Sequence, residues 1–166
     1  MDSELYRLAV EAGRTLQAGG RMLVTAESCT GGWVAEAMTM VPGSSQWFER
    51  GFVTYTDLAK RDMLGVQPDT LERHGAVSEA TVREMVAGAL ANSPGDVALA
   101  VSGVAGPGGG TAAKPVGMVC LAWGLRGGDA VAVTRHFPGD REAVRRDSVI
   151  AALEGLIKML QAHPAS

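Results

Sequence analysis

The sequence predicts a three-layer α/β/α domain built on a mixed, mostly parallel sheet of about five strands. Segments with helical periodicity alternate with short apolar runs, the pattern of βαβ units. Only one pair of strand-like segments, late in the chain, is spaced for a hairpin. With 166 residues, 46% of them hydrophobic, the chain has the size of one domain with its own core. We therefore expect a single domain over residues 1–166, with its core at about 4–161.

In the first half of the chain, helical and strand-like segments alternate. Leu5, Leu8 and Leu16 recur at helical spacing, and Gly19-Gly20 ends that helix. Ser78 is placed to cap the last helix of this half. The predicted elements, in order, are a helix over 4–18, a strand over 22–26, a helix over 30–40, a strand over 48–55, short helices over 57–64 and 68–73, and a helix over 79–91.

The second half contains a buried strand, a glycine-rich loop, a hairpin and a long helix. The strand is indicated by a continuous apolar run, and the hairpin by Arg126-Gly127-Gly128-Asp129 between two apolar segments. The predicted elements are a strand over 97–101, a loop over 102–115, strands over 116–123 and 130–137, and a helix over 140–160.

Composition argues against several classes of protein. The net charge is −3 and basic residues do not cluster, so no nucleic-acid partner is expected. No apolar run reaches the roughly 18 residues of a membrane helix, and the polar N-terminus is unlike a signal peptide. Cys29 and Cys120 lack metal-type spacing, which predicts reduced thiols in a bacterial-type cytoplasm and no metal or other cofactor.

Residues 25–32, Thr-Ala-Glu-Ser-Cys-Thr-Gly-Gly, connect the first predicted strand to a helix. Backbone N–H groups at such a helix start attract anions and can stabilise developing negative charge. Ser28 is the leading nucleophile candidate, and its alternative role is that of a helix cap. Cys29 is the rival nucleophile, because a thiol at a helix start has a lowered pKa, but a buried space-filling role is favoured for it.

A serine nucleophile needs a base. No Ser-His-Asp arrangement can be identified from His74, His136 and His163. Lys60 is the other candidate, on condition that burial lowers its pKa; the alternative is a solvated lysine on a helix surface. Tyr55 ends a predicted strand, so its hydroxyl could face the same edge of the sheet.

Two further segments suggest ligand contacts. The glycines of residues 102–111 would let backbone N–H groups surround a ligand, although the loop fits neither a Walker nor a dinucleotide motif and could be merely flexible. Arg141 and Arg145 lie four residues apart on one helix face and suit a phosphate or carboxylate. The alternative is surface ion pairing with Glu142 or Asp147, and Arg146 is expected to be solvated.

Taken together, these segments resemble the CinA C-terminal domain family. The resemblance keeps motif order and spacing over almost the whole chain, and it is greatest to stand-alone members without the additional N-terminal domain. The motifs are residues 26–32 (AESCTGG), 41–45 (VPGSS), 53–55 (VTY) followed by Lys60, 74–78 (HGAVS), 102–107 (SGVAGP), 114–117 (KPVG) and 137–141 (FPGDR). The chain departs from the usual pattern at Asp57, at Gly108 and at Ser102, where Asn, an acid and Thr are common.

The resemblance implies hydrolysis of the carboxamide of nicotinamide mononucleotide to the acid and ammonia, a step of pyridine nucleotide salvage, without metal. It implies that Ser28 is the nucleophile, Lys60 its base and Tyr55 an assisting or orienting group. It also implies a homodimer, in which Trp33, Trp47 and Phe48 would be interface aromatics or core residues. The implied substrate-binding residues are Thr30, Gly31, Gly32, Ser44, Ser102, Gly103, Gly106, Arg141 and Arg145.

Two other functions stay open. The chain could be a non-catalytic nucleotide-binding or regulatory module connected with competence or DNA-damage responses. It could also be an amidase for another small amide. Release of ammonia from nicotinamide mononucleotide, compared with free nicotinamide, distinguishes all three.

Overall fold

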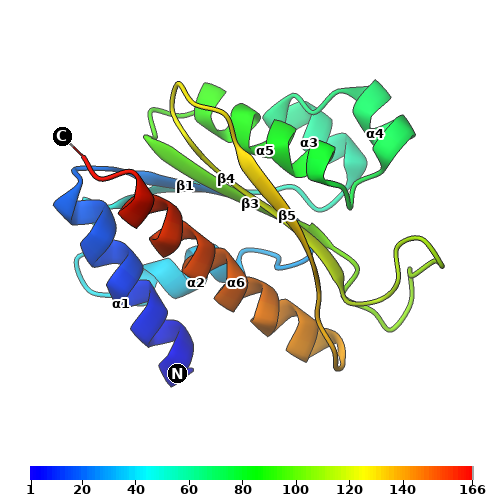
Figure 1. Cartoon of the computed structure of the whole chain (residues 1–166), viewed down its shortest axis with the longest axis horizontal. Helices are drawn as coiled ribbons and strands as arrows, with labels where there is room; N and C mark the ends of the chain where they lie inside the picture. The colour runs from blue at the N-terminus through cyan, green and yellow to red at the C-terminus, as the bar shows by residue number, and fades with distance from the viewer. Residues whose placement is uncertain (166) are drawn as a thin grey trace.

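A five-stranded sheet with helices on both faces forms the protein, as the computed structural model of residues 1–165 shows (Figure 1). The strand order across the sheet is β2-β1-β3-β4-β5. The strands are β1 (Leu23–Glu27), β2 (Phe48–Val53), β3 (Val97–Gly103), β4 (Met118–Leu125) and β5 (Val131–His136). The helices are α1 (Ser3–Ala18), α2 (Trp33–Thr39), the 3₁₀ helix η1 (Ser44–Gln46), α3 (Asp57–Leu64), α4 (Pro68–His74), α5 (Glu79–Ala91) and α6 (Arg141–Ala162).

The sheet is mixed, as predicted. Strand β1 pairs in parallel with β2 and with β3, whereas β4 pairs antiparallel with both β3 and β5. Four strands therefore run in one direction and only β4 is reversed, which confirms the expectation of a mostly parallel sheet. The β4–β5 pair is the hairpin expected from the sequence.

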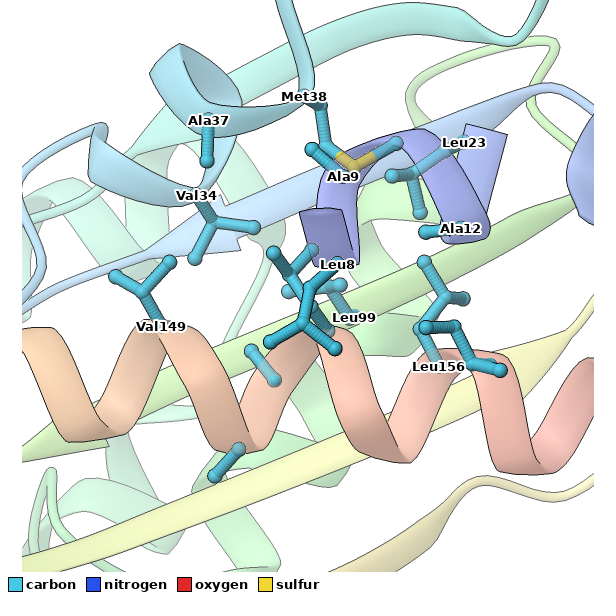
Figure 2. Close-up of a cluster of buried hydrophobic side chains, with 14 of the residues drawn as sticks. Leu8, Ala9, Ala12, Leu23, Val34, Ala37, Met38, Leu99, Val149 and Leu156 are labelled. Carbon is cyan, nitrogen blue, oxygen red and sulfur yellow. The ribbon is translucent and has the colours of Figure 1, made fainter. Parts of the chain in front are cut away.

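Helices α1, α2 and α6 cover one face of the sheet, shown below it in Figure 1. Large apolar side chains from β1 and β3, among them Leu23 and Leu99, pack there against Leu8 and Leu156 (Figure 2). All four are almost completely buried. Burial of a side chain of this size contributes roughly 1.5–3 kcal/mol. Most of the large buried apolar side chains lie on this face, which we call the large-residue core.

Helices α3, α4 and α5 cover the opposite face. Successive residues of a strand point to opposite faces, and here the alternate positions are small: Ala26, Ala98, Ala100 and Ala122. Val82, Met85 and Val86 of α5 fill the layer above them. This face holds the catalytic candidates described below.

Capping residues fix most helix starts near the predicted places. Asp2, Ser78 and Asp140 accept hydrogen bonds from first-turn N–H groups of α1, α5 and α6. Helix α2 starts at Trp33 rather than at the predicted residue 30, because residues 28–32 form a turn with two left-handed glycines. No helix among the described residues is long and apolar enough to span a membrane.

The expectation of a solvated Arg146 is wrong. Its guanidinium binds the carboxylates of Asp2 and Glu4, with Nε 2.6 Å from Asp2 Oδ2 and Nη2 3.1 Å from Glu4 Oε2. The start of α1 lies against α6, so these partners are more than 140 residues away in the chain. Spacing along one helix cannot identify an ion pair of this kind.

Candidate active site

Ser28 lies directly after β1, at the carboxyl edge of the three parallel strands. Its N–H donates to Val101 O at 2.9 Å, and the N–H of Thr54 donates to Glu27 O at 2.8 Å. Ser28 is thus held between the ends of β3 and β2, next to buried Ser102 and Thr54. The segment after β1 crosses one face of the sheet through α2, and the segment after β2 crosses the other through α3–α5. Crevices at such a change of direction commonly bind ligands.

Lys60 reaches Ser28 from α3, above the small-residue face. The Thr56 hydroxyl caps this helix by accepting from the Ala59 N–H. The Lys60 side chain is only 1% exposed. Its Nζ lies 3.0 Å from Ser28 Oγ, 2.9 Å from Thr54 O and 3.3 Å from Tyr55 O.

The surroundings of Lys60 favour a neutral amine. Burial lowers the pKa of Lys60 from its ordinary value, against a smaller opposing effect of the Asp57 carboxylate. Among residues 1–165, no carboxylate forms an ion pair with Lys60. A neutral amine has two N–H donors and one lone pair. The two carbonyls match the donors, and the lone pair is left for the Ser28 hydroxyl proton.

The rival nucleophile, Cys29, has opposite surroundings. Its side chain points into the α1/α2/α6 layer and is buried. Burial, with a smaller contribution from the Glu27 charge, raises the pKa of the Cys29 thiol to about 11. A thiol held protonated in an apolar core is a poor nucleophile. Of the two candidates, the geometry favours Ser28.

Tyr55 contributes to the site through its backbone. Its carbonyl oxygen is 3.3 Å from Lys60 Nζ and 3.4 Å from Ser28 Oγ. Its side chain is 58% exposed, and its hydroxyl accepts a hydrogen bond of 3.0 Å from Arg141 Nη2. The phenol is thus bound to an arginine at the protein surface.

The two candidate arginines make different contacts. Arg141 Nη1 donates to Gly106 O at 2.8 Å, which joins the glycine-rich loop to Tyr55. Arg145 donates to Cys29 O at 3.1 Å and Thr30 O at 3.2 Å, and its guanidinium lies 5.3 Å from the ring centre of Trp33. With Glu142, these arginines and Trp33 line one surface hollow. Arg145 stabilises the turn of residues 28–32 as well as lining the hollow.

The glycines near the site allow close backbone packing. Gly31 and Gly32 have φ of +60° and +104°, and Gly106 has +84°, conformations that other residues rarely adopt. A Cβ on Gly103 would lie 2.6 Å from a Val119 methyl group, so only glycine allows β3 and β4 to approach here. The glycine requirement at this edge is thus explained by chain geometry.

Ser44, also expected near the substrate, is not brought to this end of the sheet. It lies in η1, just before the start of β2, and the N–H of Leu23 at the start of β1 donates to Trp47 O nearby. Because β1 and β2 are parallel, their starts lie together at the edge opposite Ser28. Trp47 is buried against Gly13 within this chain, so core packing explains it.

Sequence reasoning missed two contributors: the Thr54 carbonyl on Lys60 and the Glu27 carboxylate on α2. Backbone acceptors leave no sequence signal, whereas Glu27 lies three residues before Thr30, a spacing that could have been noted. Among the described residues, no histidine hydrogen-bonds to Ser28, and no group of three or more His, Cys, Asp or Glu side chains is arranged for a metal ion.

The family described as the CinA C-terminal domain matches residues 5–160, nearly the whole chain. The chain belongs to the CinA C-terminal domain family. Solved structures of this family share its fold: a competence/damage inducible protein from Agrobacterium tumefaciens, 46% identical, superposes with a TM-score of 0.92 over 97% of this chain and 98% of that one.

The chain is also similar to proteins named as nicotinamide-nucleotide amidohydrolases. The nicotinamide-nucleotide amidohydrolase PncC of Escherichia coli K12 is 51% identical over 155 residues, 93% of this chain and 94% of that protein. The PncC of Pseudomonas putida is 54% identical over 152 residues, 92% of this chain and 94% of that protein.

Proposed function

We propose that the protein hydrolyses the carboxamide of nicotinamide mononucleotide to nicotinate mononucleotide and ammonia. The observation that carries this proposal is the buried contact of 3.0 Å between Lys60 Nζ and Ser28 Oγ. The names of relatives more than 50% identical support the substrate. An amide hydrolase needs an activated nucleophile and a proton donor for ammonia, and this pair supplies both.

The reaction begins with proton transfer from Ser28 to the lone pair of Lys60. Ser28 Oγ attacks the carboxamide carbon, and the carbonyl π electrons move to oxygen. As the tetrahedral intermediate collapses, the C–N bond breaks and Lys60 returns the proton to nitrogen, which leaves as ammonia. Water, deprotonated by Lys60, then attacks the acyl ester; the acid is released and Ser28 regains its proton. The sum is amide plus water to acid plus ammonia.

The turn of residues 28–32 supplies backbone N–H donors for the oxyanion. Among residues 1–165, the N–H groups of Cys29 and Thr30 donate to no other residue. The N–H after a nucleophile serves this purpose in other hydrolases. Loss of one such donor typically costs about 10²–10³ in rate.

The hollow formed by Trp33, Arg141, Glu142 and Arg145 is the proposed phosphate site. Arginine suits phosphate because its planar donors bind two oxygens at once. Tyr55 and Gly106 are both bound to Arg141, and they connect this hollow to the Ser28–Lys60 pair. A phosphate there would leave the carboxamide end of the substrate to face Ser28.

The test is ammonia release by the purified protein from nicotinamide mononucleotide and from free nicotinamide. We expect rapid ammonia release from nicotinamide mononucleotide and slow release from free nicotinamide, because only the nucleotide has a phosphate that binds the arginines. Ser28→Ala should abolish release, whereas Cys29→Ala should keep most of it. Binding of the nucleotide without ammonia release would favour a regulatory module, and equal rates on both compounds would favour an amidase for another amide.

A further inference from the structure

Glu27 is a fully buried acid that the mechanism above does not use. It is the last residue of β1, directly before Ser28, and is 1% exposed. Its backbone lies in register with Val53 on one side and Val101 on the other. Because neighbouring residues of a strand face opposite ways, its side chain points toward α2 while Ser28 points toward Lys60.

Three donors converge on the Glu27 carboxylate. Oε1 accepts from the Thr30 hydroxyl at 2.6 Å and from the Val34 N–H at 2.8 Å, and Oε2 accepts from the Ala35 N–H at 3.0 Å. Helix α2 has glycine at its N-cap position, Gly32, which offers no side-chain acceptor. Glu27 therefore supplies from the preceding strand the cap that α2 lacks, where a negative charge also complements the helix dipole.

The turn between Glu27 and α2 is consequently held on two sides. The carboxylate binds donors of Thr30 and α2, while Arg145 of α6 binds the carbonyls of Cys29 and Thr30. The Gly31 N–H donates to Ser28 O within the turn. The N–H groups of Cys29 and Thr30, which donate to no other residue among 1–165, lie on the segment that these contacts fix.

We propose that Glu27 is a positioning residue, which sets the Ser28 hydroxyl against Lys60 and directs the Cys29 and Thr30 N–H groups toward the substrate. This role rests on the proposed serine–lysine function. Glu27 touches neither Ser28 Oγ nor Lys60; it acts through the turn and the start of α2. Displacement of reacting groups by about 1 Å can cost roughly 100-fold in rate.

Glu27→Gln is the discriminating variant because it keeps size and shape. An amide has one acceptor oxygen, so in either orientation its NH₂ group faces an α2 N–H and one donor loses its partner. Glu84→Gln is the matched control. Glu84 likewise accepts from one backbone N–H, that of Gln67, and one threonine hydroxyl, that of Thr70, between α4 and α5.

Three quantities are measured for both variants: kcat and KM for nicotinamide mononucleotide, the rate at which a fluorophosphonate labels Ser28, and Tm. For Glu27→Gln we expect kcat and the labelling rate to fall together by about 10- to 100-fold, with KM within about threefold of the unmodified protein. Glu84→Gln should lower Tm without changing either rate per folded molecule. A purely structural Glu27 would behave like Glu84, and that result overturns the proposal.

The remaining outcomes also decide the matter. If Glu27→Gln does not fold, Thr30→Val removes a single contact of the three, and an unchanged labelling rate in that variant refutes positioning. If the unmodified protein labels but releases no ammonia, the substrate is wrong and the labelling comparison still tests Glu27. If it does neither, the proposed function fails. The positioning role, which rests on that function, then fails with it, and amide hydrogen exchange at Val34 and Ala35 in Glu27→Gln reports only whether Glu27 caps α2.

Discussion

The two faces of the sheet differ in the size of the side chains they carry. Toward α1, α2 and α6, the strands present Leu23, Leu99, Leu121 and Trp123, which make a dense apolar layer. Toward α3, α4 and α5, the strands present mainly alanines. Both faces are buried, yet only the second receives a lysine, Lys60, whose Nζ ends beside Ser28. Small side chains on that face leave room for helices to approach closely and for a long side chain to lie beneath them.

Close approach is visible in one glycine on each side. A Cβ on Gly88 of α5 would lie 1.8 Å from the carbonyl oxygen of Leu64, at the end of α3. A Cβ on Gly155 of α6 would lie 2.1 Å from the Trp123 ring. The first glycine places the helix that carries Lys60, whereas the second places a helix against the large-residue core. One face is thus built to position a reactive group, and the other to hold the sheet.

The largest expected effect comes from replacing one basic residue on each face. Lys60→Met should lower kcat by at least about 10³-fold, since it removes the proposed base. Arg146→Met, on the α1/α6 side, removes an ion pair with Asp2 and Glu4 and should lower stability while kcat per folded molecule stays the same. Ammonia release and thermal unfolding measure the two effects. Loss of catalysis per folded molecule in Arg146→Met would show that both faces of the sheet support the reaction.

The burial of Lys60 also leads to a prediction of how the reactivity of Ser28 depends on pH. Lys60 acts as a base only when neutral, so the labelling of Ser28 by a fluorophosphonate should rise with pH and level off above the Lys60 pKa. Burial lowers that pKa, so the midpoint should lie below the ordinary lysine value near 10.4, with about tenfold loss per pH unit beneath it. Cys29→Ala should leave the profile unchanged, because the Cys29 thiol, with a pKa of about 11, takes no part. A midpoint at the ordinary lysine value would show that Lys60 is solvated.

Gly88→Ala and Gly155→Ala compare the two faces directly. Both introduce a clash that should cost about 1–3 kcal/mol, or roughly 2–12 °C in Tm for a chain of this size. Gly88→Ala should also reduce kcat by about tenfold, because movement at Leu64 is transmitted to Lys60 one turn earlier on α3. Gly155→Ala should leave kcat per folded molecule unchanged. Equal losses of kcat in both variants would mean that the two faces do not differ in function.

The spacing of apolar residues and the positions of turn residues were enough to predict the element order and the mixed sheet. Most helix starts were predicted because capping side chains such as Ser78 are local. The pairing of Ser28 with Lys60 was different: residue type alone favoured a solvated lysine, and only the family resemblance suggested a base. The burial of Lys60 depends on the alanines of β1 and β3 and on Gly88, which are distant from Lys60 in the chain. Contacts such as Arg146 with Asp2, or Arg145 with Cys29 O, likewise depend on how α6 crosses other segments.

The smallest expected effect concerns the start of α1, on the face with the large apolar side chains. Hydrogen bonding to Arg146 lowers the pKa of Asp2 from its ordinary value of 3.8 to about 2 in the folded protein. Asp2 therefore stabilises the fold fully above the unfolded value, and this contribution disappears as pH falls from about 4 to about 2. Asp2→Asn keeps the α1 cap, since asparagine caps as well as aspartate, but loses the charge. Its urea midpoint should lie below that of the unmodified protein at pH 7, and the gap should close between pH 4 and pH 2. Ammonia release at pH 7 should not change, because Asp2 acts on the face that holds the sheet. A gap that persists at pH 2 would mean that the difference does not come from the charge of Asp2.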